Sequence, residues 1–131
     1  MRFVVPSVLL LVALIHVLPL AGVLSAAKVS SLYGIAVQDP NLEILMRHRA
    51  VLFGLLAAFL AYSAFHRHLH GLALVAAVVS VVSFLILAVA VGNYNAALST
   101  VVKADILALV LLAVAAGVHL RTPSEASHLE R

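Results

Sequence analysis

The sequence contains no cysteine, and only 10% of its 131 residues are charged. Without cysteine the chain has no disulfide, no thiolate metal site and no thiol nucleophile. It also lacks a glycine-rich phosphate loop, a serine nucleophile elbow and a His-Glu-x-x-His zinc motif, so common signatures of catalysis are missing. Hydrophobic residues make up 65% of the chain, which leaves too few polar residues to cover a soluble domain of this size.

Four long apolar runs occupy most of the chain. A helix needs about 20 apolar residues to cross a hydrocarbon layer roughly 30 Å thick, and each run comes close to this length with its flanking residues. The N-terminal run is longer than the apolar core of about 7 to 15 residues in a typical cleaved signal peptide, so we expect it to be retained. The sequence therefore predicts an all-α, four-span antiparallel transmembrane helix bundle within residues 1–121. The helices are expected at about 3–24, 42–65, 71–92 and 101–120, followed by a short polar tail at 122–131.

The distribution of lysine and arginine gives a weak prediction of orientation. The net charge of +3 is spread over the helix ends, which suits lipid headgroups and indicates no nucleic-acid partner. Each side of the expected bundle carries four cationic residues. The tie is broken if Arg47 lies inside the bundle, and both termini are then expected in the cytoplasm. The two sets are Arg2, Arg67, Arg121 and Arg131 against Lys28, Arg47, Arg49 and Lys103.

Small residues mark one face of the helix expected at 42–65. In a bilayer, close helix contact relies on glycine, alanine and serine, because burying leucine gains little against apolar lipid. We therefore expect the face with small residues to pack inward, and Arg49 on the opposite face to contact headgroups together with Lys103. The inward set is Glu43, Arg47, Ala50, Gly54, Ala58 and Ala61, and the outward set is Arg49, Phe53, Leu56 and Leu60.

A group of polar residues is expected to converge in one leaflet. A single charge near the centre of a membrane helix costs about 2.5 to 3.5 kcal/mol, so buried charges need partners. Arg47 placed between Glu43 and Asp105 would neutralise both carboxylates, and Tyr94 and His16 are expected at similar depth. Two interpretations stay open: a structural clamp that fixes helix register, or a binding site for a lipid headgroup, a quinone or a small anion.

The histidines allow two further hypotheses. His16 and His48 lie at similar expected depth, and two facing imidazoles in a helical bundle are typical of haem b binding, although His48 is about 100° off the expected packing face. Four other histidines gather at the opposite end and are candidate metal ligands, but a solvated loop explains them better because no carboxylate or cysteine accompanies them. These four are His66, His68, His70 and His119.

Several short strings between about residues 15 and 110 are shared with a group of known sequences. They are His16-Val-Leu-Pro-Leu-Ala-Gly-Val-Leu24, Leu32-Tyr-Gly-Ile35, Pro40-Asn-Leu-Glu-Ile-Leu-Met-Arg-His-Arg-Ala-Val-Leu-Phe-Gly54, Gly92-Asn-Tyr-Asn-Ala96 and Lys103-Ala-Asp105. Through them the chain resembles small, uncharacterised four-helix inner-membrane proteins of bacteria. The resemblance implies a bacterial inner membrane and supplies no functional residue.

Some members of that group carry the label phosphopantetheine adenylyltransferase. The soluble enzymes of that name use a His-x-Gly-His phosphate site, whereas this chain has His68-Leu-His-Gly71 in an expected membrane hairpin. Adenylyltransferase activity is therefore not expected. The leading expectation is a non-enzymatic membrane protein that binds a lipid, a small amphiphile or a membrane partner protein, with homo-oligomers as an option. The alternatives are a haem- or quinone-linked redox component and a small transporter subunit that acts as an oligomer.

Overall fold

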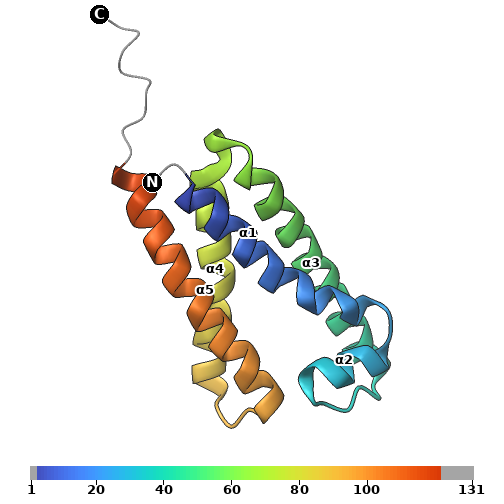
Figure 1. Cartoon of the computed structure of the whole chain (residues 1–131). Helices are drawn as coiled ribbons and strands as arrows, with labels where there is room; N and C mark the ends of the chain where they lie inside the picture. Colours follow the sequence, from blue (N-terminus) through green and yellow to red (C-terminus); the bar gives the residue numbers. More distant parts are fainter. Residues whose placement is uncertain (1–2, 122–131) are drawn as a thin grey trace, which may run out of the picture.

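The structure is a computed structural model that describes residues 3–121, and this part of the chain is helical with short turns and no strand. The expectation of an all-α fold is thus confirmed for these residues. In chain order the elements are α1 Val4–Val17, the 3₁₀ helix η1 Leu18–Val23, α2 Ala26–Tyr33, α3 Pro40–Ala64, the short 3₁₀ helix η2 Arg67–Leu69, α4 His70–Val91 and α5 Ala96–Arg121 (Figure 1).

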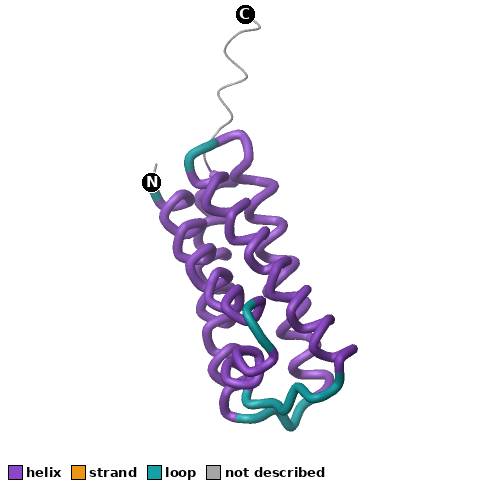
Figure 2. The backbone as a smooth tube through the Cα atoms, turned by 90° about the vertical axis from the view of Figure 1, so that its right-hand side faces the viewer, coloured by secondary structure: helices purple, strands orange, loops and turns teal. Residues whose placement is uncertain are grey.

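The long helices lie side by side in a helical bundle (Figures 1 and 2). One end of the bundle carries α2 and the turn between α4 and α5, and we call it the α2 end. The other end, here the η2 end, carries η2 and the start of α1. Four helical segments are long and apolar enough to cross a membrane: Val4–Val23, Pro40–Ala64, Arg67–Val91 and Ala96–Arg121. The expectation of four long apolar helices is thus confirmed.

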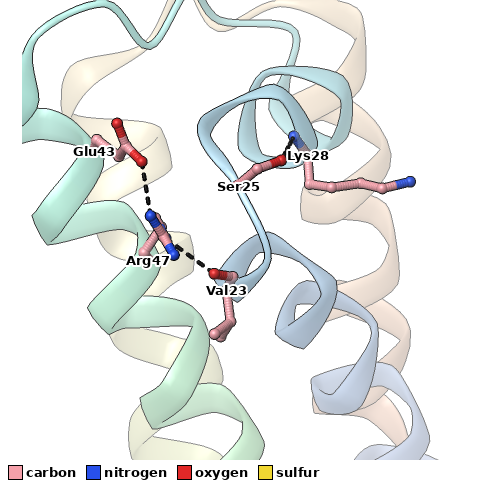
Figure 3. Close-up of polar contacts among 5 residues, drawn as sticks. All are labelled: Val23, Ser25, Lys28, Glu43 and Arg47. Carbon is pink, nitrogen blue, oxygen red and sulfur yellow. Dashed lines mark hydrogen bonds and ion pairs between the residues drawn. The ribbon is translucent and has the colours of Figure 1, made fainter.

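The first span changes its helix type near its end. α1 continues directly into η1 at Leu18, and Pro19 stands at the start of this 3₁₀ segment. Because proline lacks the N–H that an α-helix would use, a change of hydrogen bonding is expected there. The span therefore ends in a short 3₁₀ helix, and the last residue of that helix, Val23, lies beside α3 (Figure 3).

Side-chain caps set the starts of α3 and α5. The Oδ1 atom of Asp39 accepts a hydrogen bond from the backbone N–H of Asn41 at 2.7 Å, and Pro40 occupies the first turn of α3. The Oδ1 atom of Asn95 likewise accepts from the N–H of Leu98 at 2.8 Å. α5 consequently begins at Ala96, five residues before the expected start at residue 101.

The connection between the first two long helices contains a further helix, α2, that lies outside the four expected ranges. Ser25 caps α2 by accepting the N–H of Lys28 at 3.2 Å, and Gly34 ends it with φ +63°, a conformation that favours glycine. The side-chain amide of Asn95 donates to the carbonyls of Tyr33 at 2.8 Å and Gly34 at 3.1 Å. Asn95 therefore caps α5 and fixes the end of α2 against it.

The core is formed by large side chains among alanines. Leu60 of α3 is fully buried, whereas Ala58 is exposed, so the face expected to pack inward on this helix is wrong in part. The physical reason is that α3 packs against α1 and α4, so the side that meets these helices is buried whatever its content of small residues. Core members with no exposed surface are Leu9, Val12, Leu60, Ala73, Ala77, Val81, Ala108, Leu112 and Ala115.

Replacing the buried Leu60 tests this packing. Leu60→Ala should lower the free energy of unfolding in mild detergent by about 2 kcal/mol or more, because it leaves a cavity in the core. Leu55 on the same helix is 62% exposed, and Leu55→Ala should change it by less than about 0.5 kcal/mol. The measurement is denaturant unfolding followed by circular dichroism. Equal losses in the two variants would contradict the burial of Leu60.

Candidate functional site at the α2 end

Arg47 joins α3 to the end of the first span. Its Nη1 atom lies 2.8 Å from Oε1 of Glu43, one turn earlier on α3, and its Nε–H donates to the carbonyl of Val23 at 2.9 Å (Figure 3). The last carbonyls of a helix lack partners within the helix, and an arginine can supply the missing donor. Arg47 thus caps η1 from a neighbouring helix while Glu43 balances its charge.

A shallow hollow lies beside this ion pair. It is lined by Pro40, Glu43, Ile44 and Arg47 and has a volume of about 360 Å³. The side chains of Arg47 and Glu43 are 42% and 35% exposed, so both can be reached from outside the protein. Ile44 and Pro40 supply the apolar part of the lining. The hollow therefore places an ion pair beside an apolar wall, so it offers both charged and apolar contacts.

Arg49 points away from the ion pair and lies among aromatic rings. Its guanidinium carbon is 4.8 Å from the ring centre of Phe53, 5.3 Å from that of Tyr33 and 5.9 Å from that of Phe84. The rings belong to α2, α3 and α4, so one cation contacts three helices. This differs from the expectation that Arg49 reaches outward to headgroups. Positions 47 and 49 are about 200° apart around a helix, and the face of Arg49 is the one covered by neighbours.

Asp105 lies within electrostatic range of His16 and Arg49 and makes no ion pair with Arg47 in the described residues. Its carboxylate is half-buried and interacts electrostatically with His16 and Arg49. Among the described residues it makes no hydrogen bond and no ion pair, so the expected contact of Arg47 with Asp105 is absent there. The early start of α5 explains the difference. Asp105 lies nine residues after the start of α5 and Arg49 nine after that of α3, about 13 to 14 Å along each helix.

We call Arg49, its three aromatic rings and Asp105 the interior cluster. His16 is buried next to it. It is 2% exposed, and its Nδ1–H donates to the carbonyl of Val12 at 2.9 Å. A carbonyl only accepts, so Nδ1 carries the proton and Nε2 faces the hydroxyl of Ser80 at 3.5 Å. His48 is exposed. One imidazole is therefore inside and one outside, and this arrangement does not fit the paired histidine ligands of haem b.

Two other expected site residues lie apart from the ion pair. Tyr94 is 40% exposed in the turn before α5, and in the described part of the chain it makes no hydrogen bond or ion pair with the network. Lys103 is exposed on α5. It lies seven residues after the helix start, as Arg47 does in α3, which places both about 10 Å from the ends of their helices.

The remaining histidines form two pairs at the η2 end. His66 stacks on Tyr62 with ring centres 4.0 Å apart and has His68 at 6.0 Å, while His70 and His119 lie 6.4 Å apart on α4 and α5. Within residues 3–121, no three histidine or acidic side chains gather in a way that could hold a metal ion. The four candidate metal ligands are thus split between two places.

Sequence reasoning missed several residues that build this end of the bundle. The rings of Tyr33 and Phe84 come from distant segments, and no sequence pattern links them to Arg49. Phe53 was detectable, because it follows Arg49 by four residues and such pairs meet on a helix. Asn95 was also detectable as a helix cap, but its bonds to α2 were not.

Comparisons with models of protein families, with curated proteins and with solved structures found no match.

The pairing of Arg49 with Asp105 can be measured by a double-mutant cycle. Arg49→Ala should lower the free energy of unfolding by about 1 to 2 kcal/mol, because it removes the cation from three rings and isolates a half-buried carboxylate. Asp105→Asn should then restore at least about 0.5 kcal/mol in the Arg49→Ala background. Lys103→Ala on the exposed surface is the control and should change little. Strictly additive losses for the first two substitutions would contradict the coupling.

The phenol of Tyr33 gives a prediction for alkaline pH. Burial raises the pKa of Tyr33 above its usual value of 10.0, while the charge of Arg49 opposes this. A raised pKa in the folded state means that the neutral phenol stabilises the fold fully below pH 10, and that this contribution is lost as the pH rises through the folded pKa. The melting temperature should therefore fall above pH 10, and fall less in Tyr33→Phe. The exposed Tyr94→Phe should behave like the wild type, and identical profiles for all three proteins would refute the prediction.

Proposed function

We propose that the chain is an integral membrane protein with four antiparallel spans that binds the headgroup of an amphiphile at the surface of one leaflet. The observation that carries this proposal is the hollow at Arg47, where an accessible ion pair lies beside an apolar wall. Four long apolar segments support the membrane setting. The resemblance noted above favours a bacterial inner membrane.

The depth of the hollow supports a position at the headgroup level. From residue 48 to the end of α3 there are 17 residues, and from residue 104 to the end of α5 there are 18. These lengths correspond to about 26 and 27 Å, close to the thickness of the hydrocarbon layer. Arg47 and Lys103 then lie at its boundary, where cationic side chains meet phosphates. The exposed Tyr94 on the same end suits the aromatic belt of an interface.

A strip of exposed apolar side chains leads from the hollow along α3. Ile44, Val51, Leu55 and Tyr62 are 67%, 39%, 62% and 58% exposed. They follow one another at steps of seven, four and seven residues, which keeps them on one face of the helix. A headgroup in the hollow would place its acyl chain against this strip. The arrangement therefore matches a molecule with a polar head and a long apolar tail.

Orientation follows from the cations that contact other parts of the protein. Arg47 bonds to Glu43 and Val23, and Arg49 lies over aromatic rings, so both are used inside the structure. Lys28 and Lys103 are then the exposed cations in the described residues of the α2 end. The segments expected on the opposite side of the membrane carry four arginines, which are Arg2, Arg67, Arg121 and Arg131. We therefore propose that the η2 end and both termini face the cytoplasm.

Single cysteines test the four-span topology, because the chain has no cysteine of its own. Ser31 is exposed at the α2 end and His68 at the η2 end. In intact cells, a membrane-impermeant maleimide should label Ser31→Cys, whereas His68→Cys should react only after the membrane is opened. Labelling of both variants in intact cells would rule out opposite sides, and the reversed pattern would overturn only the orientation.

Binding of an amphiphile is tested by native mass spectrometry of protein extracted in mild detergent. The wild type should retain phospholipid, and Arg47→Gln should retain clearly less at the same detergent concentration. Lys103→Gln removes one charge at the same depth without touching the hollow, so it should keep most of the lipid. Equal retention by all three proteins would contradict a site at Arg47. A bound quinone in place of phospholipid would instead favour a redox component.

A further inference from the structure

We infer that the hollow at Arg47 and Glu43 selects headgroups that combine a phosphate with a primary ammonium, as in phosphatidylethanolamine. This inference rests on the proposed function and names the class of ligand. The charges of Arg47 and Glu43 cancel, since their side chains form a 2.8 Å ion pair. A purely anionic headgroup would meet the carboxylate as well as the guanidinium. A zwitterionic headgroup offers an opposite charge to each.

Arg47 keeps donors for a phosphate while it is held in place. A guanidinium has five N–H groups, and Arg47 uses one on Nε for Val23 and one on Nη1 for Glu43. In the described structure, the other N–H on Nη1 and both on Nη2 make no hydrogen bond. Two anchored positions fix the plane of the guanidinium, so these three N–H groups are preorganised. A planar pair of such donors matches two oxygens of a phosphate.

Glu43 keeps acceptors for an ammonium. Only its Oε1 atom is engaged by Arg47, and the second carboxylate oxygen makes no hydrogen bond among residues 3–121. A primary ammonium has three N–H donors and can bond to this oxygen while remaining close to its own phosphate. The trimethylammonium of a choline headgroup has no N–H and loses this bond. A glycerol headgroup carries no positive charge at all.

No third charge next to the ion pair favours an anion. Lys28 is the other cation drawn in Figure 3, and its side chain extends away from Arg47 and Glu43. Its backbone N–H is engaged in capping α2 through Ser25. The lining of the hollow adds only Pro40 and Ile44 to the ion pair. The lining therefore holds one positive and one negative group, and the Asp39 carboxylate directly before Pro40 adds no attraction for an anion.

The test is competition among three lipids with the same acyl chains. Purified full-length protein in mild detergent is mixed with equal amounts of phosphatidylethanolamine, phosphatidylcholine and phosphatidylglycerol, and lipid adducts are counted by native mass spectrometry. The wild type should prefer phosphatidylethanolamine by about fivefold over each of the others, as expected for one additional exposed charge-assisted hydrogen bond. Preference for phosphatidylglycerol would overturn the inference and leave the proposed function standing. Absence of adducts with every lipid would overturn the proposed function.

Two conservative variants assign the selectivity to the ion pair. Glu43→Gln keeps an oxygen that can accept from Arg47 but loses the negative charge, so the preference should shift by about fivefold toward phosphatidylglycerol. In Arg47→Lys, the three N–H donors of the lysine must serve Val23, Glu43 and the lipid phosphate. The binding of all three lipids should therefore weaken to a similar extent. Lys103→Gln is the control and should keep the wild-type ratios. Melting temperatures verify that each variant is folded. An unchanged preference in folded Glu43→Gln would refute the role of its carboxylate.

Discussion

Two arginines on opposite faces of one helix are the constraint on which this end of the bundle depends. A guanidinium that loses part of its contact with water needs partners inside the protein, because an unpaired charge is costly to bury. Arg47 finds a carboxylate on its own helix and a carbonyl at the end of η1. Arg49 finds three aromatic rings and the charge of Asp105. Arg47 therefore ties α3 to η1, and Arg49 ties it to α2 and α4.

The two solutions differ in their access to the outside, and this difference separates structure from binding. Arg49 is half-buried and joins three helices through its aromatic contacts. The ion pair of Arg47 remains accessible, with unused donors and acceptors next to an apolar strip. α2 completes the arrangement, because Asn95 fixes its end to the start of α5 and Tyr33 presents its ring to Arg49. The segment between the first two long helices therefore belongs to the cluster around Arg49.

Hydropathy predicted the number of long helices and their approximate ends, because a bilayer demands long apolar runs of nearly constant length. The pairing of charges was harder to predict. Asp105 was placed beside Arg47 because α5 was expected to start at residue 101, and the cap by Asn95 moved that start to Ala96. The inward face of α3 was assigned from its small residues, yet Leu60 is buried in the core against the neighbouring helices. Such errors arise because the buried face of a helix depends on the side chains of its partner helices, and the sequence of one helix does not specify these contacts.

The central claim is that Arg47, held by Glu43 and Val23, contacts a headgroup phosphate. The most direct measurement is solid-state NMR dephasing between ¹⁵N-labelled arginine side chains and lipid ³¹P in a reconstituted bilayer. We expect dephasing that corresponds to about 4 Å between a guanidinium nitrogen and phosphorus, the separation when an N–H donates to a phosphate oxygen. This dephasing should disappear in Arg47→Lys. A short contact that persists in that variant, or no short contact in the wild type, would contradict it.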